Sequence, residues 1–266
     1  MRLQDRVAIV VGAGQSPGEG IGNGRATALT FAREGARVLC VDHHVESAQE
    51  TVDMIAAKGG TAAAFKADVT RNAELKAMAE DAHARWGRID ILHNNVGVSL
   101  AGGDAELSDF TEEAFERCVA INLKSCIFAA KHVIPIMRAQ QSGVIINISS
   151  MAVITTYPYV AYKATKAAMV AFTEQLAYQN ARYGIRANVI LPGLMNTPMA
   201  VDTRAREFKK TRAEVEAERD AQVPLRRKMG TGWVVANAAL FLASDEANFI
   251  TGVTLPVDGG ASVRRG

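Results

Sequence analysis

The stretch VAIVVGAGQSPGEGIGNGRATA, residues 7–28, decides the fold of this chain. Its first five residues are aliphatic, which predicts a short strand buried on both faces of a parallel sheet. A glycine-rich segment follows and leads into a helix predicted over residues 25–34. Glycines there let the backbone turn tightly and let a pyrophosphate approach the N–H groups at the positive end of the helix. This strand, loop and helix therefore predict a dinucleotide-binding α/β fold.

The order of strand and helix repeats along the chain. Short β-branched and aliphatic runs predict six more strands, at residues 37–41, 62–69, 89–93, 144–148, 186–191 and 252–257. Apolar residues three and four apart predict further helices at residues 46–58, 72–86, 112–138 and 164–183. The alternation predicts a single-domain Rossmann fold over residues 1–266, with a doubly wound parallel sheet of about seven strands and helices on both faces. Residues 199–228 are charged and helical in composition, and we expect them to be an insertion that covers the substrate.

Composition narrows the classes of function. The 266 residues are 48% hydrophobic and carry a formal net charge of +2, too small to indicate nucleic acid or an anionic membrane as the main partner. The first apolar run, residues 7–13, is far shorter than the roughly 20 residues of a membrane span and lacks the cleavage pattern of a secretory signal. We therefore expect a cytoplasmic protein. No metal is expected, because the three cysteines form no CxxC pair and the five histidines have no metal-binding spacing.

Acidic and amide residues end several predicted strands at one edge of the sheet. Asp42 ends the second strand, where a carboxylate accepts hydrogen bonds from the adenosine ribose and repels a 2′-phosphate, so NAD is expected in preference to NADP. The alternative is a turn aspartate that caps the following helix. Asp68, Val69 and the Asn-Asn-Val-Gly run at residues 94–97 are expected to line the same crevice.

The strongest catalytic candidate is a tyrosine. Tyr162 and Lys166 lie four residues apart at the start of a predicted helix and so share one face. A phenol is a poor base at neutral pH, but a neighbouring ammonium and a cationic nicotinamide stabilise the phenolate. A serine at the preceding strand end, Ser149 or Ser150, is expected to hold a substrate oxygen while hydride passes to or from the nicotinamide. Tyr159 also precedes a lysine by four residues, but it follows a proline and lies before the predicted helix, so we reject it.

These residues, in this order, resemble the short-chain dehydrogenase/reductases of the compact, single-domain type, and the resemblance covers nearly the whole chain. The matching positions are residues 12–28, Asp68, residues 94–97, Asn122, Ser150, Tyr162, Lys166, residues 192–199 and residues 257–260. The resemblance implies an oxidoreductase that transfers hydride between NAD(H) and a small-molecule secondary alcohol or ketone. The family is commonly tetrameric, so the resemblance implies a homotetramer. The apolar surface of the predicted helices at residues 112–138 and 164–183 indicates subunit contacts, deep burial within one subunit being the alternative.

The resemblance also implies a role for each matching residue. Tyr162 would be the acid/base, and Ser150 would orient the substrate oxygen. Lys166 would bind the nicotinamide ribose and lower the pKa of Tyr162, and Asn122 would hold a relay water. The positions expected to bind the cofactor are Gly12, Gly22, Gly24, Asp42, Asp68, Val69, Asn95, Gly97, Tyr162, Lys166, Pro192, Gly193 and Thr197.

Two assignments stay open. About six extra residues, 15–20, enlarge the glycine loop, so Gly20 and Gly22 compete with Gly22 and Gly24 as its second and third glycines. We favour Gly22 and Gly24, because residues 25–28 then fall in the order of the family. Ser150 is preferred to Ser149, because a strand register is rigid whereas the following loop tolerates a deletion.

Two other functions are also compatible with the fold. A non-catalytic NAD sensor or scaffold would use the same architecture, since a fold alone does not establish activity. Retention of all four catalytic positions argues against it. A 3-oxoacyl thioester reductase that uses NADPH would keep the chemistry and change both the substrate and the cofactor.

Overall fold

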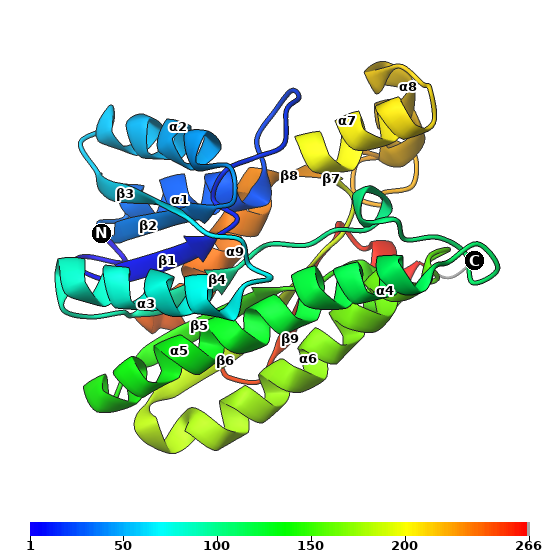
Figure 1. Ribbon diagram of the computed structural model, residues 1–266. Coiled ribbons are helices and arrows are strands. Elements are labelled where there is room, and N and C mark those ends of the chain that lie inside the picture. The colour runs from blue at the N-terminus through cyan, green and yellow to red at the C-terminus, as the bar shows by residue number, and fades with distance from the viewer. Residues whose placement is uncertain (265–266) are drawn as a thin grey trace.

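A computed structural model of the protein describes residues 1–264, so the last two residues of the predicted 1–266 domain lie outside the described residues. Seven parallel strands form the main sheet, in the order β3-β2-β1-β4-β5-β6-β9 (Figure 1). The predicted doubly wound parallel sheet of about seven strands is confirmed. The strand order reverses between β1 and β4, and ligands bind at such a switch point in open parallel sheets.

The elements follow one another as the alternation predicts. The strands of the main sheet are β1 (Val7–Val11), β2 (Arg37–Asp42), β3 (Thr61–Lys66), β4 (Ile91–Asn94), β5 (Gly143–Ile148), β6 (Ile185–Pro192) and β9 (Thr254–Val257). The α-helices are α1 (Asn23–Arg33), α2 (Val45–Ala56), α3 (Asn72–Trp86), α4 (Glu112–Val119), α5 (Ser125–Gln140), α6 (Val160–Asn180), α7 (Pro198–Glu207), α8 (Arg212–Asp220) and α9 (Gly232–Ala243).

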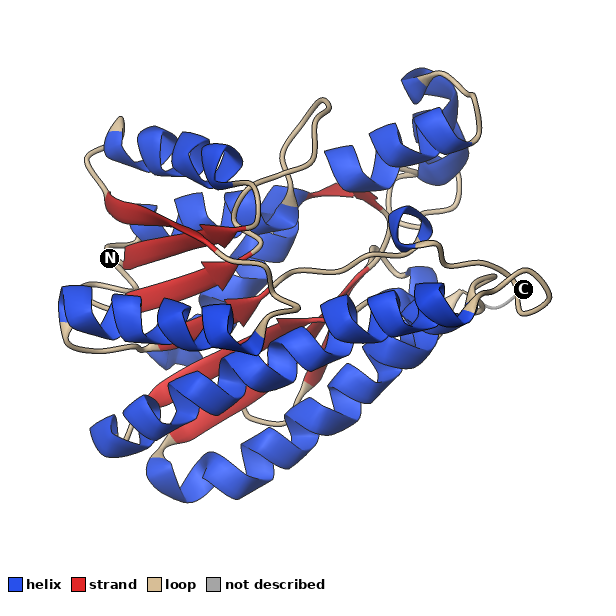
Figure 2. Cartoon of the chain, viewed as in Figure 1, coloured by secondary structure: helices blue, strands red, loops and turns tan. Residues whose placement is uncertain are grey.

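Each face of the sheet has its own apolar core. Successive residues of a strand point to opposite faces, so Ala8 and Val10 of β1 join one core and Ile9 and Val11 the other. Helices α1, α2 and α9 cover the first face, and α3, α5 and α6 cover the second (Figure 1). Figure 2 shows the strands of the main sheet pointing the same way, with α7 and α8 beyond their arrowheads. Burial on both faces explains why the strand sequences are almost continuously apolar.

Apart from shifts of up to three residues at the ends of other elements, and from helix α9, which is not among the predicted helices, the structure differs from the predicted elements in three places. The helix predicted over residues 112–138 is interrupted by a π-helical segment, η2 (Ala120–Lys124), where hydrogen bonding shifts to i→i+5. Helix α6 begins four residues before the predicted position, at Val160, because oxygens of a distant loop accept hydrogen bonds from its first N–H groups. The two-residue strands β7 (Met195–Asn196) and β8 (Gly230–Thr231) are too short for a periodic pattern.

The helical segment Glu112–Gln140 is long and apolar enough to cross a membrane by length and composition. Core helices of globular domains pass the same test, so the property is weak evidence for a span. Here the segment packs against α3 and α6. Its Ala129, Val133 and Met137 are buried in the second core of the sheet.

A buried histidine in β4 makes stability depend on pH. His93 is fully buried, and neither ring nitrogen has a hydrogen-bond partner among the described residues. Burial lowers the pKa of His93 to about 3, whereas an unfolded chain has a histidine pKa near 6.5. Below pH ~6.5 the unfolded chain therefore binds a proton that the folded protein does not, and the free energy of unfolding is expected to fall by about 1.4 kcal/mol per pH unit from this residue.

The replacement His93→Leu removes this titration and places an apolar side chain of similar size in the core. Urea unfolding of the variant, followed from roughly pH 7 down to pH 4, is expected to show a shallower loss of stability than the wild type. His83→Leu is the matched control, because His83 is exposed on α3. Equal slopes for wild type and His93→Leu would contradict the assignment.

Candidate active site

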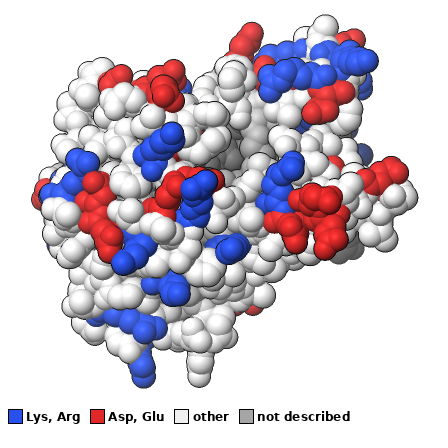
Figure 3. Space-filling view, viewed as in Figure 1, with Lys and Arg blue, Asp and Glu red and all other residues white. Residues whose placement is uncertain are grey.

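The catalytic positions expected from the sequence gather at the carboxyl ends of the parallel strands. Lys166 of α6 reaches the ends of two strands, since its Nζ donates to the carbonyl oxygens of Ile148 at 2.7 Å and of Val96 at 3.4 Å. Ser150 follows the end of β5, and Tyr162 lies one turn before Lys166 on the same helix. Figure 3 shows a hollow at this edge, between the body of the molecule and the surface over α7 and α8.

The two candidate serines have different partners. Ser149 is buried, and its Oγ donates to the carbonyl oxygen of Lys166 at 2.8 Å, so this hydroxyl is held by the backbone of α6. The Oγ of Ser150 accepts from the N–H of Ala152 at 3.2 Å, and this hydroxyl lies close enough to the phenol of Tyr162 to lower its pKa. The structure therefore brings Ser150 and Tyr162 together and leaves Ser149 as a contact between strand and helix.

The phenol of Tyr162 is protonated at neutral pH in the protein alone. Burial raises its pKa to about 12, and this is the largest effect on it. The nearby hydroxyl of Ser150 lowers the pKa of Tyr162, as does the positive charge of Arg204, while the negative charge of Asp104 raises it. A base at this position therefore needs further positive charge close by.

Lys166 is a buried cation that faces the same space. Burial lowers the pKa of its ammonium to about 8, so it is mostly charged at neutral pH. Its Nζ lies 5.9 Å from the centroid of the Tyr162 ring. A Cβ at Gly97 would lie 2.9 Å from Nζ, so the glycine leaves the space that the lysine occupies. The lysine is thus positioned by backbone carbonyls, and it does not lie in hydrogen-bond contact with the phenol.

Asn122 lies in the π-helical segment η2 and is fully buried. Its side chain forms two hydrogen bonds with the backbone of Val98, from Val98 N–H to Oδ1 at 2.7 Å and from Nδ2 to the Val98 carbonyl oxygen at 2.9 Å. Nδ2 also donates to Thr165 of α6 at 3.1 Å. π-Helical bulges are frequent at functional sites. Here the bulge lets one amide join the loop after β4 to the helix that carries Tyr162.

The glycine-rich loop leaves room for backbone alone. A Cβ at Gly24 would lie 1.8 Å from the carbonyl oxygen of Gly12, so α1 approaches the end of β1 as closely as a glycine permits. Gly12 has a φ of +83°, and a Cβ there would lie 2.9 Å from Val96. Gly22 is the N-cap of α1. Backbone N–H groups at the start of a helix fit a pyrophosphate, and that of Gly22 donates here to Oε1 of Gln15 at 3.1 Å.

The enlarged part of this loop turns toward the charged insertion. A Cβ at Gly18 would collide with the carboxylate of Asp202 in α7, and Glu19 lies 3.6 Å from the guanidinium of Arg212 in α8. Arg212 also forms an ion pair with Asp202 and one with Glu216 at 2.9 Å. The glycine loop and the insertion therefore meet across the edge of the sheet. We call Glu19, Asp202, Arg212 and Glu216 the bridging ion-pair cluster.

Asp42 lies at the end of β2 beside the glycine loop. One carboxylate oxygen accepts from the N–H of Gly14 at 3.1 Å, and the other accepts from the N–H of His44 at 3.1 Å. The contact with His44 is the turn interaction that the sequence leaves open. The contact with Gly14 holds the carboxylate against the loop, where a dinucleotide fold binds the adenosine ribose.

The other expected cofactor positions on this side lie at the ends of β3 and β4. Asn95 donates from Nδ2 to the carbonyl oxygen of Gly12 at 3.2 Å, which ties the end of β4 to the glycine loop. Asp68 accepts hydrogen bonds from the hydroxyl and N–H groups of Thr70, which lower the pKa of its carboxyl. Val69 is half-buried beside it.

The positions after β6 are held by close backbone packing. The N–H of Gly193 donates to the carbonyl oxygen of Val257 at 2.9 Å, and a Cβ at Gly193 would lie 2.6 Å from the Cα of Asp258. Pro192 is the last residue of β6. Thr197 is the N-cap of α7, so its hydroxyl already has a structural partner in the first turn of the insertion.

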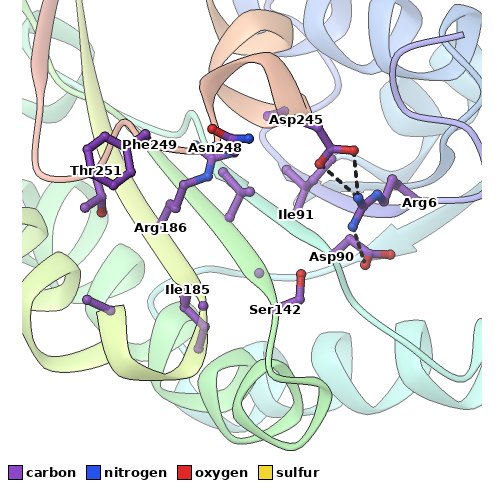
Figure 4. Close-up of a pocket in the computed structure, with 15 residues that line it drawn as sticks. Arg6, Asp90, Ile91, Ser142, Ile185, Arg186, Asp245, Asn248, Phe249 and Thr251 are labelled. Atoms are coloured by element: carbon purple, nitrogen blue, oxygen red, sulfur yellow. Dashed lines mark hydrogen bonds and ion pairs between the residues drawn. The ribbon is translucent and has the colours of Figure 1, made fainter.

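A cavity of about 400 Å³ lies at the opposite edge of the sheet, away from these residues. Asp90, Gly143 and Ile185 line it at the amino ends of β4, β5 and β6 (Figure 4). Arg6 pairs there with Asp245 at 3.0 Å and with Asp90 at 3.5 Å, so charges that line the cavity neutralise one another. Parallel sheets bind ligands at their carboxyl ends. The cavity therefore does not belong to the candidate active site.

The parallel sheet, the glycine loop and the Tyr162–Lys166 pair together define a dinucleotide-dependent class of enzyme, and comparison with known sequences identifies the same class. A family model described as enoyl-(acyl carrier protein) reductase matches residues 17–262. The chain belongs to the short-chain dehydrogenase/reductase family and is an oxidoreductase. Membership implies a nicotinamide cofactor, and the glycine-lined space at Gly12 and Gly24 fits one.

Particular relatives extend over almost the whole chain. The dehydrogenase LinX of Sphingobium indicum, named for 2,5-dichloro-2,5-cyclohexadiene-1,4-diol, is 36% identical over 98% of this chain and 98% of its own. The 3-oxoacyl-(acyl-carrier-protein) reductase FabG of Thermotoga maritima is 34% identical, over 98% of this chain and 99% of its own. A crystal structure described as a short-chain dehydrogenase/reductase from Burkholderia xenovorans superposes with a TM-score of 0.90 at 40% identity, covering 100% of this chain and 99% of the other.

Proposed function

We propose that this oxidoreductase transfers hydride between NAD(H) and a secondary alcohol or ketone, with Tyr162 as the residue that gives and takes the proton. The observation that carries the proposal is the meeting of Ser150, Tyr162 and the buried Lys166 at the carboxyl edge of the sheet. This edge also holds the glycine loop. A proton-transferring group and a cofactor site that share one edge suit hydride transfer.

The chain's own residues supply binding and proton transfer. The glycine loop and Asp42 hold the adenosine half, and Lys166 binds the nicotinamide ribose. A bound nicotinamide supplies the hydride acceptor or donor and, when oxidised, a positive charge. Ser150 holds the substrate oxygen, and in alcohol oxidation the hydroxyl proton passes to the Tyr162 oxygen. In ketone reduction the proton moves from Tyr162 to the oxygen that becomes the hydroxyl. Asn122 holds the relay water through the backbone of η2, since its side chain is bonded to Val98.

Asp42 is the residue that favours NAD in this proposal. Asp42→Ala is expected to weaken NAD binding by about tenfold or more, because hydrogen bonds to a charged group contribute about 1.5–3 kcal/mol, and to leave NADP binding equal or tighter. Titration of intrinsic fluorescence with each dinucleotide measures both affinities. Asp53→Ala, an exposed position on α2, is the matched control. A wild-type protein that binds NADP more tightly than NAD would show the cofactor assignment to be wrong.

A 3-oxoacyl thioester reductase that uses NADPH is the second candidate. The likeness to FabG and the description of the family model favour it. The carboxylate of Asp42 at the glycine loop argues against NADPH, because it would repel a 2′-phosphate. The likeness to LinX favours a cyclic alcohol or ketone instead.

The experiment that tests the proposal is a turnover screen followed at the nicotinamide absorbance, with NAD(H) and NADP(H) in parallel. Its panel contains sugars, cyclic diols, steroids and 3-oxoacyl thioesters, as well as ketones that carry a carboxylate. The last group is included because Arg204 of the insertion is close enough to Tyr162 for its charge to lower the phenol pKa. Tight NADH binding without turnover across the panel would favour the non-catalytic sensor or scaffold.

The insertion is proposed to cover the substrate. Lys and Arg side chains gather on the surface over its helices α7 and α8 (Figure 3).

The chain is proposed to assemble as a homotetramer in the cytoplasm. Large apolar side chains are exposed at Trp233, Phe241 and Phe249 in and after α9 and at Tyr178 of α6. Subunit contacts would bury them. Sedimentation equilibrium at micromolar concentration measures the assembled mass, and a monomer there would overturn the tetramer.

A further inference from the structure

A buried carboxylate outside the expected site holds the start of the helix that carries Tyr162. Asp104 lies in the loop between β4 and α4 and is 4% exposed. Its Oδ1 accepts from the N–H of Ala161 at 2.9 Å, and its Oδ2 accepts from the N–H of Tyr162 at 3.0 Å. The carbonyl oxygen of Ala105 accepts from the N–H of Val160 at 3.3 Å. Two adjacent loop residues thus bond to the first three N–H groups of α6.

Helix α6 has no side chain of its own that caps its N-terminus. The first N–H groups of a helix lack partners within the helix, and a Ser, Thr, Asp or Asn at the N-cap usually accepts one of them. The N-cap of α6 is Tyr159, whose side chain forms no capping hydrogen bond. A negative charge near a helix N-terminus is also favourable. Because Asp104 comes from another loop, it fixes where the helix starts relative to β4.

The same carboxylate anchors an aromatic ring beside Tyr162. The Ser99 hydroxyl lies 3.2 Å from Oδ2 of Asp104 and 3.0 Å from the hydroxyl of Tyr157. Ser99 has one proton and an ionised carboxylate only accepts, so Ser99 donates to Asp104 and Tyr157 donates to Ser99. The rings of Tyr157 and Tyr162 lie 5.4 Å apart between centroids. Tyr157 therefore packs against Tyr162 through a chain of hydrogen bonds that ends at Asp104.

From these contacts we infer that Asp104 is a positioning residue for the reaction, which holds the phenol of Tyr162 in place at the candidate active site through the first turn of α6 and through Tyr157. The inference rests on the role proposed for Tyr162. It adds a residue of the loop after β4 to the groups on which turnover depends. Asp104 touches neither substrate nor cofactor in this arrangement, since its two oxygens are occupied by Ala161, Tyr162 and Ser99.

Asp104 also acts on Tyr162 by its charge. The charged and titratable groups that affect the Tyr162 phenol are Asp104, Tyr157 and Arg204, while Lys166 lies beneath its ring. Asp104 raises the pKa of the phenol and Arg204 lowers it. On its other side Asp104 faces Cys118 of α4, whose pKa it also raises. Removing the charge of Asp104 therefore lowers the pKa of Tyr162.

Asp104→Asn keeps the shape of the side chain and removes the charge and one acceptor. We expect kcat for alcohol oxidation to fall about tenfold or more, with the dissociation constant of NADH unchanged within about twofold, because none of the side-chain hydrogen bonds of Asp104 involves the glycine loop. The pH at half-maximal kcat is expected to move downward. Amide hydrogen exchange at residues 160–162 is expected to accelerate, because two of these N–H groups lose a charged acceptor. The matched control is Asp109→Asn, an exposed carboxylate of the same loop.

Each result bears on the inference separately from the proposed function. Faster exchange at residues 160–162 with unchanged kcat and an unchanged pH profile would overturn it and leave the acid/base role of Tyr162 intact. A loss of kcat accompanied by weaker NADH binding and an unmoved pH profile would also overturn it, since a general distortion of the active site would then account for the loss. Tyr157→Phe provides a second variant that leaves the cap in place. It keeps the ring and loses the hydroxyl, so a smaller fall in kcat with normal exchange is expected, and a wild-type kcat would count against the aromatic contact.

Discussion

Replacing Tyr162 by Phe is expected to lower turnover by about 10²- to 10⁴-fold while NADH still binds, because the phenol hydroxyl is the proton-transferring group and the ring supplies only packing. The remaining ring is expected to stay between Tyr157 and Lys166. Steady-state kinetics on the substrate found by the screen measure kcat, and fluorescence titration measures NADH binding. The rate of alcohol oxidation by the wild type should rise with pH, since burial raises the phenol pKa and the base is the deprotonated form.

Two further tyrosines provide the controls. Tyr178 lies on the same helix and is 83% exposed, so Tyr178→Phe should leave turnover unchanged. Tyr159, the rejected rival, is the N-cap of α6 and lies outside its first turn. Tyr159→Phe should therefore lose little turnover. If Tyr162→Phe kept near-normal kcat, the acid/base assignment would be wrong whatever the cofactor.

Gly24→Ala is expected to abolish dinucleotide binding and to destabilise the fold by about 3 kcal/mol or more. A methyl group at this position would lie 1.8 Å from a backbone carbonyl oxygen and 2.6 Å from Nδ2 of Asn95, so α1 has to move away from β1. That movement displaces the N–H groups at the helix start. Urea unfolding measures the loss of stability. NADH titration without urea, with the result corrected for the fraction of protein that is folded, measures the loss of binding.

Gly59→Ala is the control for the effect of replacing a glycine by alanine where no close packing is involved. Gly59 has a φ of +77° and no atom within 4 Å of the position of a Cβ. Its replacement therefore costs only the strain of a left-handed backbone, about 1–2 kcal/mol, and leaves NADH binding unchanged. A Gly24→Ala protein as stable as Gly59→Ala would contradict the close packing of α1 against the end of β1.

Much of the fold could be predicted because its signals are local. The run at residues 7–11 pairs with neighbours on both sides, and such strands are apolar throughout whatever the rest of the chain does. Tyr162 and Lys166 could be found from a spacing of four residues, which fixes their relation on any helix. These features depend on residues that lie within one strand or one turn of each other.

The parts that could not be predicted depend on contacts between distant residues. Asp104 follows two glycines and looks like a turn residue, and nothing near it in the sequence shows that its carboxylate bonds to N–H groups 57 and 58 residues later. The choice between Ser149 and Ser150 depends on which way each side chain points from the end of β5. The π-helical turn at Asn122 leaves the apolar spacing of the surrounding helix intact, so periodicity alone does not reveal it.

The bridging ion-pair cluster has a consequence for how specificity can change in this chain. It ties the enlarged glycine loop to the helices of the insertion, so a mutation in one alters the electrostatic surroundings of the other. In a relative whose glycine loop lacks the extra residues, Glu19 has no counterpart and the arginine of α8 loses that partner. Grafting residues 198–220 from such a relative to redirect substrate choice would therefore leave Glu19 without the arginine it pairs with, unless residues 15–20 were exchanged as well. The two segments are one module for protein engineering, although 177 positions separate them in the printed sequence.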